Sequence, residues 1–151
     1  MPLTNDRDTL ETAIDNFTTG GWTAGHLGTA WGWYMLSDSW GALLPGDSSP
    51  KPYGTKNLFK AVVLMTDGEF NTSWRNDDSD DQAISLCNAM KDKDIIVYAV
   101  SFKSANHPTL LSCASADNSG NQLYWDADNG SELTAAFKDI AIRLTNLRLD
   151  K

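Results

Sequence analysis

Two oxygen-bearing side chains, those of Asp67 and Thr23, stand where a metal ion could be bound. Asp67 follows the apolar run AVVLM at residues 61–65, which predicts a strand at about 59–66, buried on both faces. Ligands of open α/β sheets sit at the carboxyl ends of strands, and carboxylate and hydroxyl oxygens suit Mg²⁺. The alternative is that Asp67 only starts a turn and that Thr23 only caps the helix that follows it.

Other chemistries lack their motifs in this sequence. No Gly-x-Gly-x-x-Gly follows a strand and no Gly-Lys-Ser/Thr loop is present, which argues against nucleotide binding. The only histidines are His26 and His107, and no Gly-x-Ser-x-Gly elbow offers a nucleophile, so the protein is predicted not to be an enzyme. We expect His26 on a helix surface. The acidic run at 76–81 predicts a helix start, with Ser79 and Gln82 as a capping box.

The composition indicates one folded domain. The chain has 151 residues, is 41% hydrophobic and contains six Trp, which is enough apolar material for a core. The net charge of −8 argues against nucleic acid or an anionic membrane as partner, and is compatible with a cation or a basic surface. The chain as given contains no stretch that resembles a membrane span or a signal peptide, although a longer parent could carry an export signal.

The order of apolar patterns predicts an α/β fold. Helical spacing occurs at residues 8–18, 22–36, 83–90, 108–114 and 133–147, and strand-like runs at 59–66, 95–102 and 123–125. A loop is expected at 37–57. Strands that alternate with helices predict a parallel sheet with helices on both faces.

The two cysteines, Cys87 and Cys113, are too few for a structural zinc site. They fit one disulfide in an oxidising compartment, or two small core residues in the cytosol.

Five segments together closely resemble the C-terminal region of TadG-like proteins of tight-adherence (Flp) pilus assembly, which carry a von Willebrand factor A domain. They are TAGHLGTAWGWYMLS, LMTDGEFNT, ISLCNAMKDKDIIVYAVSF, LLSCASA and LTAAFKDIAIRLTNLRL. The resemblance implies a three-layer αβα, Rossmann-like fold with a mostly parallel sheet. Residues 1–151 would be the C-terminal portion of one such domain, truncated at its N-terminal strands.

The family's metal-ion-dependent adhesion site is built from three loops. By resemblance, Thr23 matches the second loop and Asp67 the third, whereas the Asp-x-Ser-x-Ser of the first loop is absent here. The complete domain would bind Mg²⁺ or another divalent cation, and this chain is expected to bind it weakly or not at all. The first family strand would lie beside strand 59–66, so an exposed edge and self-association through that strand are expected.

The function implied by the resemblance is a non-catalytic protein-binding or adhesion module, in which an acidic side chain of a partner completes the metal site. The alternative is a structural interaction domain with a vestigial site. The family is thought to lie in the bacterial cell envelope, periplasmic or extracellular, with the parent anchored in the inner membrane. That location favours a disulfide between Cys87 and Cys113.

Overall fold

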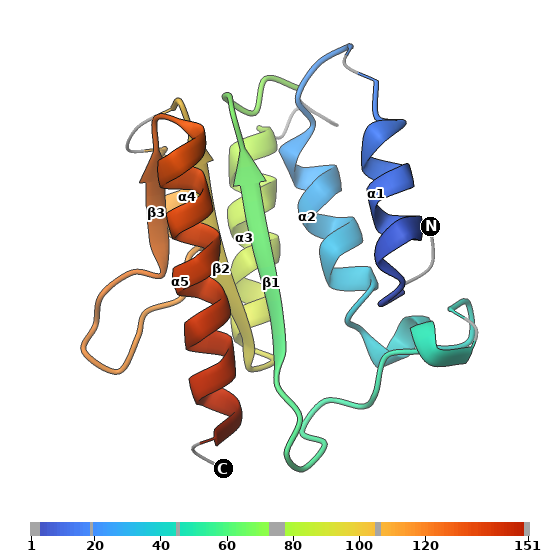
Figure 1. Ribbon diagram of the computed structural model, residues 1–151. Helices are drawn as coiled ribbons and strands as arrows, with labels where there is room; N and C mark the ends of the chain where they lie inside the picture. The colour runs from blue at the N-terminus through green and yellow to red at the C-terminus, as the bar shows by residue number, and fades with distance from the viewer. Residues whose placement is uncertain (1–3, 19, 45, 73–77, 105–106, 150–151) are drawn as a thin grey trace.

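The computed structural model of the protein describes residues 4–18, 20–44, 46–72, 78–104 and 107–149. Helices and strands alternate from β1 onward, after two initial helices and two short 3₁₀ turns, η1 and η2 (Figure 1). Their bounds are α1 Arg7–Asp15, α2 Gly25–Tyr34, η1 Asp38–Trp40, η2 Gly46–Ser48, β1 Lys60–Thr66, α3 Ser79–Lys91, β2 Ile95–Phe102, α4 Pro108–Cys113, β3 Tyr124–Ala127 and α5 Gly130–Leu149.

The three strands form one parallel sheet in the order β1-β2-β3. Lys60 to Thr66 of β1 are in register with Ile95 to Ser101 of β2. The parallel sheet and the α/β class are therefore confirmed. Because parallel strands end at the same edge, the residues that follow β1, β2 and β3 are brought to one end of the molecule.

Helices cover both faces of the sheet. Val97 and Ala99 of β2 pack in clusters with residues of α3 and α4, whereas Tyr98 and Val100 pack with residues of α5. Figure 1 shows α5 on one side of the strands and α3 on the other. This three-layer arrangement is compatible with a Rossmann-like αβα fold. Within the described residues, no helix is long and apolar enough to cross a membrane.

Strand β1 lies where the apolar run predicted it, but it is not buried on both faces. It is an edge strand that pairs only with β2 among the described residues. Its first five residues are half-buried and Met65 is 45% exposed. The neighbouring layers cover β1 incompletely, and the expected open edge is present.

Both predicted helix caps are wrong. The N-cap of α2 is Ala24, with no side-chain cap, so Thr23 does not cap this helix. The N-cap of α3 is Asp78, whose carboxylate accepts a hydrogen bond from the backbone N–H of Asp80. Since this carboxylate satisfies the first turn, the Ser79–Gln82 capping box is not needed, and Ser79 is buried instead.

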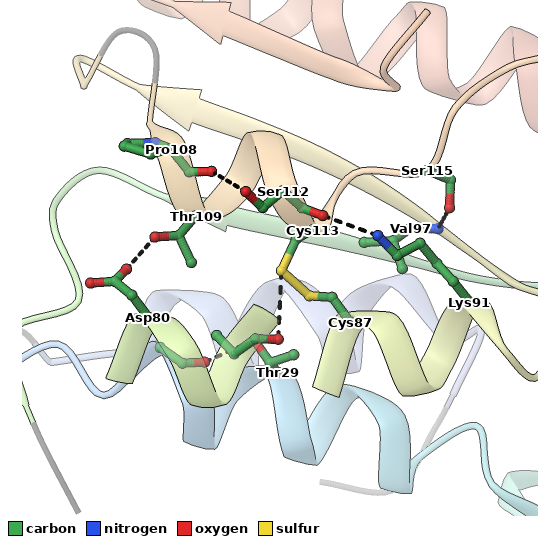
Figure 2. The surroundings of a disulfide bond; sticks show 12 residues. Thr29, Asp80, Cys87, Lys91, Val97, Pro108, Thr109, Ser112, Cys113 and Ser115 are labelled. Carbon is green, nitrogen blue, oxygen red and sulfur yellow. Dashed lines mark hydrogen bonds between the residues drawn. A yellow bond between two sulfur atoms is a disulfide. The ribbon is translucent and has the colours of Figure 1, made fainter. Parts of the chain in front are cut away.

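A disulfide between Cys87 and Cys113 joins α3 to α4, with 5.1 Å between the two Cα atoms (Figure 2). The expected pairing is therefore confirmed in the structure. Two hydrogen bonds join the same helices. The Lys91 ammonium donates to the carbonyl of Ser112 at 3.0 Å, and the Thr109 hydroxyl donates to the carboxylate of Asp80.

Candidate functional site

Two loops, one before α2 and one after β1, meet at the carboxyl end of the sheet. The backbone N–H of Thr23 donates to the side-chain oxygen of Asn71 at 2.7 Å, and the backbone N–H of Asn71 donates to the carbonyl of Thr23 at 3.1 Å. These reciprocal bonds join residues that are 48 positions apart in the sequence. The structure thus brings together the two loops that carry the predicted site residues Thr23 and Asp67.

The turn after β1 leaves the Asp67 carboxylate without a partner among the described residues. The Thr66 hydroxyl donates to the carbonyl of Gly68 at 2.9 Å and accepts from the Gly68 N–H at 3.3 Å, so Thr66 makes the turn. Asp67 is exposed, and its carboxylate makes no hydrogen bond or ion pair with any described residue. The hydroxyl of Thr23 is likewise unbonded to the described part of the chain. Both oxygens are therefore available to a ligand.

Phe70 packs the loop after β1 against the start of α2. A Cβ atom added to Gly25 would lie 2.2 Å from the Phe70 ring, so only glycine permits this approach. The Phe70 ring also lies near His107, with 5.5 Å between the ring centroids. Neither Gly25 nor Phe70 is predicted to belong to the site, because a glycine that serves a distant contact has no local signature in the sequence.

His107 connects the site loop to β3. Its side chain is 4% exposed, and Nε2 lies 3.2 Å from the carbonyl of Gly68. A carbonyl only accepts, so Nε2 carries a proton, and the buried Nδ1 has no hydrogen-bond partner among the described residues. The backbone N–H of His107 donates to the Tyr124 hydroxyl at 3.0 Å.

A hydroxyl–carboxylate cluster closes the ends of β2 and β3. The Ser101 and Tyr124 hydroxyls lie 2.9 Å apart, and both donate to the carboxylate of Asp126. Burial, reinforced by the hydrogen bond to Asp126, raises the pKa of Tyr124, so this hydroxyl stays a donor at neutral pH. The Asp126 carboxylate is thus engaged by protein donors, whereas the Asp67 carboxylate has no partner in the described part of the chain.

His26 is buried, which contradicts its predicted place on a helix surface. It is 7% exposed, and its Nδ1 lies 2.7 Å from the hydroxyl oxygen of Ser79, a residue with 0% exposure. The two residues are 53 positions apart, and they meet because α2 packs against α3. A serine that is fully enclosed cannot reach a substrate, so this pair is structural.

Comparison with known proteins gives no family assignment. No family model matches the chain, and no curated protein is significantly similar to it. The proposed function therefore rests on the geometry at the carboxyl end of the sheet and on the sequence segments quoted above.

Thr23 and Asp67 could supply only some of the ligands that a bound cation needs. Among the described residues, no group of three or more His, Cys, Asp or Glu side chains is placed to hold a metal ion. Mg²⁺ takes octahedral oxygen ligands at short distances and keeps several waters when few protein groups are present. One carboxylate and one hydroxyl would leave most positions to water or to a partner, so weak affinity is expected.

Proposed function

We propose that the protein is a non-catalytic protein-binding or adhesion module of the von Willebrand factor A type, belonging to tight-adherence pilus assembly. Thr23 and Asp67 would form part of a metal-ion-dependent adhesion site. The observation that carries this proposal is the reciprocal hydrogen bonding of Thr23 and Asn71, which holds two oxygen-bearing loops together at the carboxyl end of the sheet.

Asp67 is the residue on which binding would depend. Its carboxylate is exposed and unpaired among the described residues, whereas Asp126 is engaged by two hydroxyl donors. When bound, a divalent cation supplies the positive charge that lets Asp67 and a carboxylate of a partner approach each other. Thr66 and Phe70 hold the Asp67 loop in place, and the Thr23 hydroxyl offers a second oxygen.

A second candidate is a structural interaction domain whose cation site is vestigial. The small donor set favours it, as does the open edge of β1, where Met65 is 45% exposed. An edge strand presents unpaired backbone N–H and C=O groups and so recruits another strand. Self-association through β1 is part of this candidate.

The disulfide supports a location outside the cytoplasm. Disulfides persist in oxidising compartments such as the bacterial periplasm or the cell surface. The Cys87–Cys113 pair is therefore consistent with the proposed place in the bacterial cell envelope. Anchoring of the parent protein in the inner membrane is part of the same proposal and rests on the resemblance alone.

The two candidates are separated by Asp67→Ala in the complete parent protein. Asp8→Ala is the matched control, because Asp8 is also an exposed aspartate and lies in the first turn of α1, at the opposite end of that helix from the loop that carries Thr23. Loss of pilus assembly or cell attachment with Asp67→Ala alone would support the adhesion module. Unchanged assembly and attachment would support the vestigial site.

A further inference from the structure

A large hollow lies at the amino-terminal end of the sheet, the opposite end from Asp67. Its volume is about 1060 Å³, and four segments surround it. These are the loop that leads into β1, the connection from α3 into β2, the loop after α4, and the last turns of α5. The hollow is thus independent of the loops that carry Thr23 and Asp67.

The hollow is basic although the protein is acidic. The whole chain has 12 Lys and Arg against 20 Asp and Glu. The basic residues that line the hollow are Lys56, Lys60, Lys91, Lys93 and Arg143, and the acidic ones are Asp94 and Asp117. This reversal of the overall charge ratio concentrates positive potential at one place on the surface.

Two of these cations are free to meet a ligand. Lys56 and Lys93 are exposed and make no side-chain hydrogen bond or ion pair with the described residues. In contrast, the Lys60 ammonium donates to the carbonyl of Leu36 at 2.6 Å and stacks on the ring of Tyr53. The free lysines therefore supply the accessible positive charge.

The acidic residue Asp117 does not cancel this charge. Its carboxylate accepts from the backbone N–H groups of Asn121 and Ser119, both at 2.9 Å, and lies 3.7 Å from Arg143. The hydrogen bond from Asn121, helped by these neighbours, holds the pKa of Asp117 below its usual range. Asp117 and Arg143 therefore offset each other, and the four lysines of the lining remain against one carboxylate, that of Asp94.

Apolar side chains share the lining with the lysines. Leu58, Ile96, Leu123 and Leu147 line the hollow, and Leu58 is 41% exposed. Tyr98 also lines it, but at 1% exposure its side chain is too enclosed to reach a ligand. The lining thus offers cations and apolar surface side by side.

We propose that this hollow binds an acidic polypeptide segment of a partner protein, in which carboxylates alternate with apolar side chains. Carboxylates would meet Lys56 and Lys93, and apolar side chains would cover Leu58 and its neighbours. A single phosphate would leave most of the 1060 Å³ and the apolar lining unused. Nucleic acid is disfavoured because a long polyanion would also meet the remaining surface of a protein with net charge −8.

The test is fluorescence anisotropy of a labelled short peptide of Glu and Leu with the full chain, in EDTA, so that no divalent cation contributes. Lys56→Glu combined with Lys93→Glu is expected to weaken binding about tenfold, since two attractions become repulsions. The matched control combines Lys103→Glu with Lys138→Glu, which changes net charge equally at exposed positions outside the hollow and is expected to leave affinity within about twofold.

Several results would overturn the proposal. These are no binding of the peptide by the wild-type protein, equal losses in both double variants, or displacement of the peptide by inorganic phosphate or single-stranded DNA at lower concentration than by unlabelled peptide. Asp67→Asn is expected to leave this binding unchanged, because Asp67 lies at the other end of the sheet. The experiment can therefore refute peptide binding in the hollow without bearing on cation binding at Asp67, and the reverse also holds.

Discussion

Removal of the disulfide is expected to lower stability strongly without changing the fold. The perturbation is Cys87→Ala combined with Cys113→Ala, which takes away the covalent link between α3 and α4 (Figure 2). The two helices keep their contacts with β2 and the hydrogen bonds of Lys91 and Thr109. The free energy of unfolding therefore falls mainly because the unfolded chain, without the cross-link, gains conformational entropy.

The magnitude follows from the length of the closed loop. The cysteines are 26 positions apart. In the chain-entropy model, a loop of this length contributes about 3.5 kcal/mol to the free energy of unfolding at room temperature. With a urea slope of about 2 kcal/mol per molar, the midpoint of unfolding should fall by about 1.7 M.

The assay is urea unfolding followed by circular dichroism, with and without reductant. The double variant should behave identically in both conditions, which makes it the control for the reductant. In the wild-type protein, Cys87 and Cys113 are 0% and 1% exposed, so reduction should proceed slowly under native conditions and rapidly in urea. A loss below about 1 kcal/mol, or free thiols in the denatured but unreduced protein, would refute this reasoning.

Three further perturbations test the site loops and the open edge. Gly25→Ala should push Phe70 away and destabilise the protein by about 1–3 kcal/mol, measured by thermal unfolding, whereas Gly28→Ala on the same helix meets open space and should not. Tyr124→Phe removes the hydrogen bond donated to Asp126 and the one accepted from the His107 N–H, and should cost about 1–3 kcal/mol, against little change for Tyr34→Phe, whose hydroxyl bonds to no described residue. Sedimentation should show a concentration-dependent dimer that Met65→Lys weakens, and a wild-type protein that stays monomeric would contradict pairing through β1.

The sequence was informative where local patterns decide the structure. The run at 61–65 predicted β1 and the position of Asp67 at its end, and the apolar spacing at 133–147 predicted α5. Parallel pairing followed from the alternation of strands and helices. These features depend on neighbours within a few residues along the chain.

Most failures arose where distant residues decide. The burial of His26 depends on Ser79, which is 53 positions away. The capping box failed for a local reason, because Asp78 caps the helix one residue earlier than Ser79 would. The basic hollow gathers Lys56, Lys93 and Arg143 from three separate segments. No spacing of residues along the sequence indicates that these side chains lie close together in space. The Tyr124–Asp126 spacing of two on one strand was a usable signal for the hydroxyl cluster, because it places both side chains on one face.

The most direct test of a partial cation site at Thr23 and Asp67 is a Mn²⁺ titration followed by NMR line broadening. We expect localised broadening of the amides of Thr23 and residues 67–71, with affinity weaker than about 0.1 mM, and loss of this broadening in Asp67→Asn but not in Asp8→Asn. Broadening centred on the acidic start of α3 and unchanged in Asp67→Asn would contradict the site. So would a dissociation constant below about 10 µM, because one carboxylate and one hydroxyl cannot hold the ion so tightly.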